Sequence, residues 1–178
     1  MTHYHYQDRF KKLYQKSVEL YRSGNTNKAS WFDAEELAFI KANGWRVQDF
    51  FDYGEDQATG GEPSYEIAQS IEQARRDYFL HMQNGKRSGK TIDASELPPK
   101  DAEMDGIVWL PRIIQKAIGK LRGELCEDIM YCCGGDRHFL QTHDIHPAEF
   151  LRLVWAKVDE PEAIVDFVKT RSPETAPA

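Results

Sequence analysis

Apolar side chains recur at helical spacing along most of the chain, and no segment alternates apolar and polar residues over a useful strand length. The clearest stripe lies between Ser64 and Gln83, directly behind Pro63 as a start signal. Its members are Ile67, Ala68, Ile71, Ala74, Tyr78, Phe79 and Met82. The pattern predicts an all-α fold, a compact bundle of about six to seven helices with one long irregular connection.

Start and stop signals bound several of these helices. Asp33 and Glu36 have the spacing of a capping box, which predicts a helix running to about Asn43. A further helix is expected from Arg46 to Asp56, and another from Pro111 to Arg122.

The helical pattern stops between Asn84 and Asp105, where two glycines, two prolines and nine charged residues occur. A connection of this length inside a compact domain is usually a linker or a functional loop. We therefore expect an N-terminal helical lobe over residues 1–83, a linker or strap over 84–106, a C-terminal helical lobe over 107–170 and a flexible tail over 171–178.

Composition restricts the class of protein. The 178 residues are 40% hydrophobic and carry a net charge of -6, which is ordinary for a folded protein and unfavourable for a general nucleic-acid binder. The longest uninterrupted apolar run, Ile107 to Leu110, is too short to cross a bilayer, and the N-terminus has no apolar core for a signal peptide. Three cysteines, two of them adjacent, favour a reduced, cytoplasmic protein without a membrane partner.

Reactive side chains concentrate between Met130 and Pro147. One interpretation is a thiol site, with Cys132 and Cys133 as nucleophiles and His138 as acid or base. The anion-binding groups of that site are then the amides of Gly134 and Gly135 and the side chain of Arg137. The alternative is that both cysteines are buried apolar residues, and that the glycines allow a tight turn into a helix capped by Asp136.

The same segment also contains the ligand types of a transition-metal site. His143 and His146 are three residues apart, close in sequence to the cysteines, but neither a CxxC pair nor an HExxH helix is present. His146-Pro147 is more typical of a helix start.

Two sets of basic residues are candidates for binding a small anion. Arg112, Lys116 and Lys120 form one i, i+4 row, which either grips a phosphate or carboxylate or forms a face that is solvated or paired with Asp49, Asp52 and Asp56. Arg75 falls within the apolar stripe, so it either lines an anion pocket or forms a buried ion pair with Asp52 or Glu55.

Two blocks, Trp-Leu-Pro-Arg and Gly-Asp-Arg, stand at a characteristic separation in the C-terminal half. They belong to a longer set of residues: Gly106-Ile107-Val108-Trp109-Leu110-Pro111-Arg112, Lys116, Tyr131, Asp136-Arg137, Phe139-Leu140 and Phe150. Over roughly residues 97–167 the chain resembles the bacterial family catalogued as domain of unknown function 5069. The resemblance implies a small helical domain and brings no established activity, substrate or catalytic residue with it.

The leading hypothesis is a cytoplasmic binding or interaction module without catalysis, whose partner is an unknown protein or a small anionic ligand. It predicts a concave apolar patch on the folded protein. The alternative is a thiol- or metal-dependent enzyme or redox sensor centred on Cys132, Cys133 and His138. The sequence names no cofactor for either.

Overall fold

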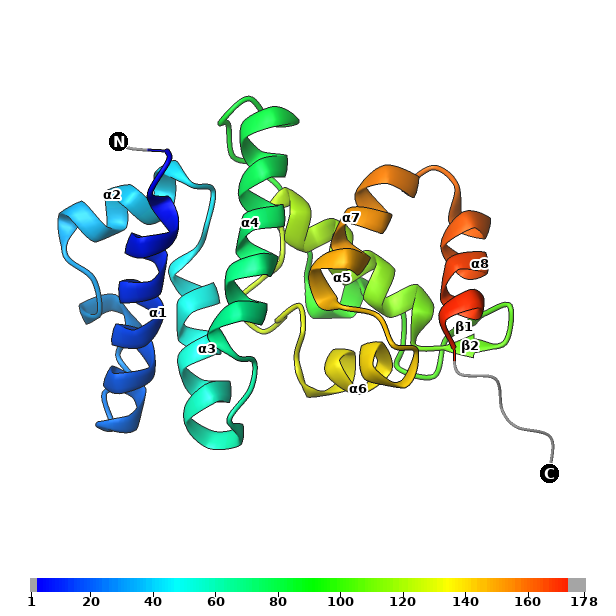
Figure 1. Ribbon diagram of the computed structural model, residues 1–178, viewed down its shortest axis with the longest axis horizontal. Helices are drawn as coiled ribbons and strands as arrows, with labels where there is room; N and C mark the ends of the chain where they lie inside the picture. The colour runs from blue at the N-terminus through cyan, green and yellow to red at the C-terminus, as the bar shows by residue number, and fades with distance from the viewer. Residues whose placement is uncertain (1–2, 173–178) are drawn as a thin grey trace. The chain divides into compact units, whose positions relative to one another are not determined.

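Figure 1 presents the computed structural model, which describes residues 3–172 and is mostly helical. Within these residues it contains eight α-helices and one two-stranded sheet. The all-α class is confirmed, but the expected number of helices is too low. The shortest helices, Ala34–Ala42 and Gly134–Thr142, have nine residues each. No helix in the described range has both the length and the apolar character for crossing a bilayer.

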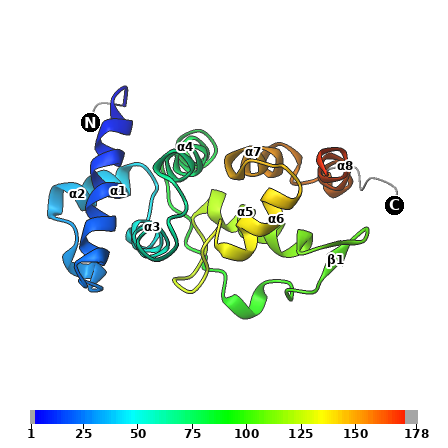
Figure 2. The same cartoon turned by 60° about the horizontal axis from the view of Figure 1, so that its bottom comes forward.

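The chain divides into two compact units, Met1–Ser88 and Gly89–Ala178, here called unit 1 and unit 2. Unit 1 contains α1 (Tyr6–Arg22), a 3-10 turn (Lys28–Ser30), α2 (Ala34–Ala42), α3 (Val47–Gly60) and α4 (Tyr65–His81). Helix α1 packs mainly against α3, and the two lie side by side in Figures 1 and 2. Its core is aromatic: the ring centroid of Phe10 lies 5.1 Å from that of Trp45 and 5.3 Å from that of Phe50.

Caps fix the helix starts of unit 1. The capping box at Asp33 is confirmed, because the Glu36 amide donates to the Asp33 carboxylate at 2.8 Å and the Asp33 amide donates to the Glu36 carboxylate at 2.9 Å. Ser64 caps α4 by accepting from the Ile67 amide at 3.3 Å. Helix α3 continues past the predicted end at Asp56 and stops where Gly61 adopts a left-handed φ of 75°.

Unit 2 is organised around α5 (Leu110–Arg122), which packs against α7 (Pro147–Lys157). Helix α8 (Pro161–Arg171) packs on α7, and α6 (Gly134–Thr142) lies between α5 and α7 in the sequence. Apolar side chains of α5 and α7 are fully buried: Leu110, Ile113, Ala117, Phe150, Leu151 and Val154. This apolar packing holds α5 in place as the platform for the site described below.

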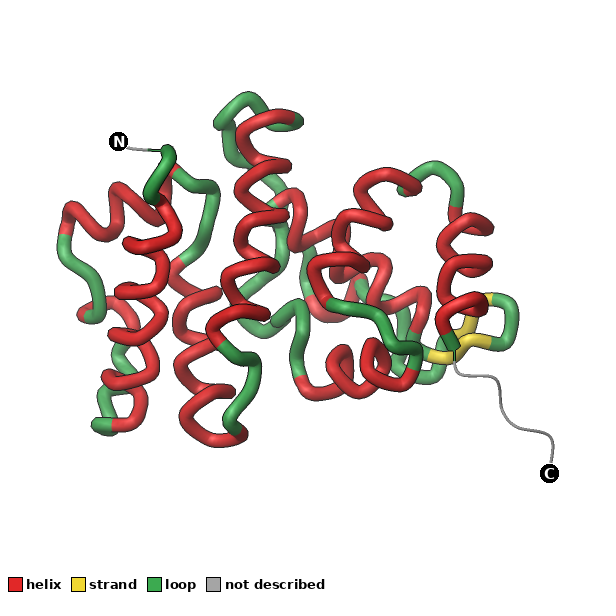
Figure 3. Tube along the Cα trace, viewed as in Figure 1, coloured by secondary structure: helices red, strands yellow, loops and turns green. Residues whose placement is uncertain are grey.

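The segment before α5 is more regular than its composition predicts. It contains a 3-10 turn (Ala94–Glu96) and an antiparallel hairpin of β1 (Glu103–Met104) and β2 (Ile107–Val108), which Figure 3 shows in yellow. Asp105 and Gly106 make the turn with φ values of 53° and 79°, the two-residue geometry that Asp-Gly favours. The hairpin therefore corrects the expectation of a wholly irregular connection.

Candidate functional site

Trp109 is the residue around which unit 2 builds its candidate site. It stands between β2 and α5 with a left-handed φ of 75°, a conformation that is unusual for a bulky side chain. Its backbone amide donates to the Ala102 carbonyl at 3.0 Å, and its indole Nε1–H donates to Asp136 Oδ1 at 3.0 Å. The strained backbone is thus held from both the hairpin and α6.

Because Gly135 has no Cβ, the Trp109 ring can lie directly against its backbone. A Cβ at this position would lie 2.6 Å from the indole Cζ2, whereas a Cβ at Gly134 would meet nothing closer than 3.9 Å. Both glycines are the first residues of α6, so they do not make the turn before it. That turn uses Cys132, whose φ is 70°. The interpretation of the glycine pair as a tight turn is therefore wrong, since Gly135 serves a close packing contact instead.

Asp136 is a fully buried carboxylate at the centre of the site. Its Oδ1 accepts from Trp109, and its Oδ2 accepts from the Cys132 amide at 2.9 Å and from the Lys116 ammonium. The N-cap of α6 is Cys133, so Asp136 does not cap the helix as the sequence suggested. Three donors instead compensate its lost hydration.

The basic row on α5 is not a solvated face. Lys116 and Lys120 are both buried, and Lys116 pairs with Asp136. Arg112 is partly buried, donates to the Pro98 carbonyl at 2.6 Å and lies over the Trp109 ring, 5.9 Å from its centroid. Arg112 therefore contacts the segment before the hairpin, and Lys116 joins α5 to α6.

The two adjacent cysteines have different surroundings. Cys132 is fully buried, and burial, with Asp136 nearby, raises the pKa of its thiol to about 12. Cys133 is partly exposed, and its Sγ accepts a hydrogen bond from Lys116 Nζ at 3.2 Å. Arg137 is bonded to the Cys132 carbonyl at 2.8 Å. Cys132 is thus unsuited to act as a nucleophile at neutral pH.

His138 lines a cavity rather than forming a hydrogen bond with an adjacent thiol in the described part of the chain. Among residues 3–172 no hydrogen bond joins its imidazole to Cys132 or Cys133, and its side chain is exposed on α6. It lines a cavity of about 500 Å³ between the hairpin and α6. The lining consists of residues 106–109 on one side and of Gly135, His138, Phe139, Thr142 and His143 on the other.

The cavity has mainly apolar walls with two imidazoles among them. Val108, 52% exposed, stands at its edge on β2. The rings of Phe139 and His143 pack with centroids 4.6 Å apart. Burial lowers the pKa of His143, whose Nδ1 lies 2.6 Å from Ser172 Oγ. The cavity is the candidate for the concave apolar patch that the binding hypothesis expects.

His143 and His146 are not brought together as metal ligands. His146 caps α7, where its Nδ1 accepts from the Ala148 amide at 3.1 Å. Across the described part of the chain, no three His, Cys, Asp or Glu side chains converge into a group that fits a metal ion.

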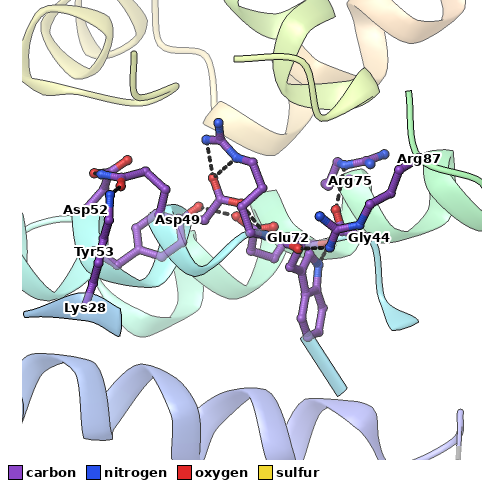
Figure 4. A network of polar contacts seen from close by, with 11 residues as sticks. Lys28, Gly44, Asp49, Asp52, Tyr53, Glu72, Arg75 and Arg87 are labelled. Carbon is purple, nitrogen blue, oxygen red and sulfur yellow. Dashed lines mark hydrogen bonds and ion pairs between the residues drawn. The ribbon is translucent and has the colours of Figure 1, made fainter. Parts of the chain in front are cut away.

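Arg75 belongs to a buried polar network in unit 1 (Figure 4). Its guanidinium donates to the Gly44 carbonyl at 3.1 Å and to Gln83 Oε1 at 2.7 Å. Glu55, one of its expected partners, is instead bonded by the Tyr21 hydroxyl at 2.6 Å. Burial lowers the pKa of Arg75 to about 10. Arg75 is therefore bonded to loop residues of unit 1 and is not among the residues that line the cavity beside Trp109.

Sequence reasoning named Gly135, His138 and His143 as candidate site residues but missed the apolar members of the cavity wall. Val108, Trp109 and Phe139 were noted only within the family resemblance. The Asp105-Gly106 pair was a usable signal, because it predicts a hairpin that ends next to Trp109.

Comparison with known proteins gives no relative for this chain: no family model, curated protein or solved structure matches it. The resemblance to domain of unknown function 5069 stays a prediction.

Proposed function

We propose that unit 2 is a binding module for a small, flat, mainly apolar organic molecule, which occupies the cavity beside Trp109. The cavity volume of about 500 Å³ falls in the range of typical ligand pockets, roughly 300 to 1,000 Å³. The observation that carries the proposal is the strained Trp109. A left-handed conformation costs about 1–3 kcal/mol, and Asp136 and Gly135 together maintain it.

The lining of the cavity favours a ligand whose main part is an apolar ring system. Trp109 and Phe139 offer aromatic surfaces, and covering the half-exposed Val108 removes apolar area from water. Because Trp109 is already fixed, little side-chain entropy is lost when a ligand contacts it. The binding free energy then comes mainly from burial of the ligand.

The polar groups favour an acceptor or an anionic group at one end of the ligand. His138 and His143 are the titratable side chains of the lining, which includes no carboxylate from residues 3–172. An imidazole N–H donates to an oxygen, and a protonated imidazole attracts a negative charge. A cytoplasmic location is part of the proposal, since Cys126, Cys132 and Cys133 are free thiols.

Fluorescence titration with N-phenyl-1-naphthylamine tests this proposal. The matched variants are Val108→Lys at the cavity edge and Val158→Lys, an exposed valine outside the lining. The lysine at position 108 stands opposite Glu103 in the hairpin, so the pair of strands is retained.

We expect saturable probe binding to wild type and to Val158→Lys, and a loss of affinity of about tenfold or more for Val108→Lys. The 8-sulfonate of the same probe should bind at least as tightly as the neutral form. Absence of saturable binding, or equal affinities of the two lysine variants, contradicts the proposal.

A further inference from the structure

We propose that His143 presents an unprotonated ring nitrogen, Nε2, to the cavity beside Trp109, and thereby selects aromatic ligands that carry a hydrogen-bond donor on the ring, as phenols do. This inference rests on the proposed function and adds the chemical class of the ligand. His143 lines the cavity, and its other ring nitrogen, Nδ1, lies 2.6 Å from Ser172 Oγ. The contact with Ser172 decides how the imidazole is protonated.

The Ser172 hydroxyl is the C-cap side chain of α8, and its one hydrogen is already used. Ser172 Oγ donates to the Val168 carbonyl at 2.9 Å. Because a hydroxyl has a single hydrogen, the same oxygen can only accept in its contact with His143. The imidazole therefore donates from Nδ1–H, and in the neutral ring Nε2 is left with a lone pair.

The surroundings of His143 favour the neutral ring. Burial lowers the pKa of His143 below its usual value of about 6.5. Within residues 3–172 no carboxylate forms an ion pair with this imidazole, so nothing offsets the cost of burying its charge. Above pH 7 the ring thus keeps one proton, on Nδ1, and Nε2 is an acceptor.

The acceptor is held in a fixed orientation. Ser172 binds one edge of the ring, and Phe139 packs against it with the centroids 4.6 Å apart. Across the described residues, the bond to Ser172 is the one hydrogen bond that the imidazole forms, so Nε2 is available to a ligand. Ser172 itself is not part of the cavity lining. The exposed His138 has no such support and serves as the donor that the proposed function assigns to the cavity.

A pair of small molecules of nearly equal shape tests whether this acceptor selects the ligand. 1-Naphthol and 1-methylnaphthalene share the ring system and differ in whether the substituent is a donor. Their affinities are measured on the full-length protein by displacement of N-phenyl-1-naphthylamine. The variant His143→Asn keeps an amide N–H in place of Nδ1, for Ser172, and removes the acceptor in place of Nε2.

The control is Thr170→Ala, which removes another hydroxyl of α8, one that donates to the Phe167 carbonyl at 2.8 Å. The preference for 1-naphthol, taken as the ratio of the two Kd values, should fall about fivefold or more in His143→Asn and stay unchanged in Thr170→Ala. An unchanged preference in His143→Asn, with both compounds still bound, overturns the inference and leaves the proposed function standing. Failure of N-phenyl-1-naphthylamine to bind wild type contradicts the proposed function and this inference together.

The protonation of the ring is measured without any ligand. Correlation of the imidazole ¹⁵N and ¹H signals above pH 7, assigned through His143→Asn, should show Nδ1 protonated and Nε2 unprotonated. Ser172→Ala should raise the fraction with the proton on Nε2, whereas Thr170→Ala should not. A proton on Nε2 in wild type overturns the inference, whether or not the variants fold.

Discussion

Each unit contains an ion pair between a basic residue and a buried aspartate, and the two pairs join residues at different separations in the sequence. In unit 1, Arg46 and Asp49 lie 2.6 Å apart at the start of α3, three residues from each other. In unit 2, Lys116 and Asp136 are 20 residues apart and join α5 to α6. The local pair completes a helix start, whereas the distant pair positions a cavity wall and holds a cation beside a thiol.

The two pairs also differ in how deeply their side chains are buried. Burial alone would lower the pKa of Arg46, but the Asp49 carboxylate raises it above its usual value. The side chain of Arg46 keeps 17% of its surface exposed, while those of Lys116 and Asp136 keep 4% and 0%. Buried charge in unit 2 is therefore more dependent on its partner.

Trp45 in unit 1 and Trp109 in unit 2 differ in their hydrogen-bond partners and in their surroundings. Trp45 is fully buried, and its Nε1 donates to the Glu72 carbonyl at 2.9 Å within the aromatic core of unit 1. Trp109 donates to a side chain, Asp136, and lines a cavity. The first indole lies in the core of unit 1, and the second forms part of a cavity wall.

The largest expected effect comes from neutralising the aspartate of each pair. Asp136→Asn leaves the Lys116 charge buried without a counter-ion and should lower the free energy of unfolding by about 3–5 kcal/mol. Asp49→Asn leaves Arg46 partly exposed and should cost about 1–2 kcal/mol. Urea unfolding of both variants measures the difference, and equal losses would break the comparison.

Adding a methyl group to α6 should produce a smaller effect. Gly135→Ala places Cβ 2.6 Å from the Trp109 ring and should destabilise the protein by about 1–3 kcal/mol while weakening binding of the naphthylamine probe. Gly134→Ala meets only ordinary contacts and should be neutral or stabilising by up to about 1 kcal/mol. Thermal unfolding of the two variants tests this, and indistinguishable midpoints would contradict the close contact.

The smallest expected effect is the pH dependence from His143. Burial lowers its pKa in the folded state, so the unfolded chain binds this proton more readily. The resulting stability is fully present above the unfolded pKa of about 6.5 and is lost as the pH falls through the folded value. His143→Asn should therefore lose less stability than wild type between pH 7 and pH 5. Parallel stability curves for the two proteins would argue against this.

The sequence predicted the helices that local signals define. The capping box at Asp33 and the stripe behind Pro63 require only neighbouring residues, and both predicted helices are found. The hairpin at Asp105-Gly106 was missed because its strands have only two residues each, too few for an alternating pattern.

The site was harder to predict because its contacts join residues far apart in the sequence. In the sequence, Lys116 is one member of the basic row. Its partners Cys133 and Asp136 lie 17 and 20 residues away, so the spacing on one helix does not show that it is paired. The glycine pair and the cysteines were singled out in the sequence as candidate site residues. Their spacing could not reveal that Trp109 fills the gap at Gly135.

The indole N–H signals of the four tryptophans in a ¹⁵N-labelled sample test the central claim most directly. The Trp109 signal, assigned through Trp109→Phe, should shift progressively and saturably as N-phenyl-1-naphthylamine is added, because its ring lines the cavity. The signals of the buried Trp31 and Trp45 should stay in place. A stationary Trp109 signal at probe concentrations that saturate the fluorescence would contradict the account.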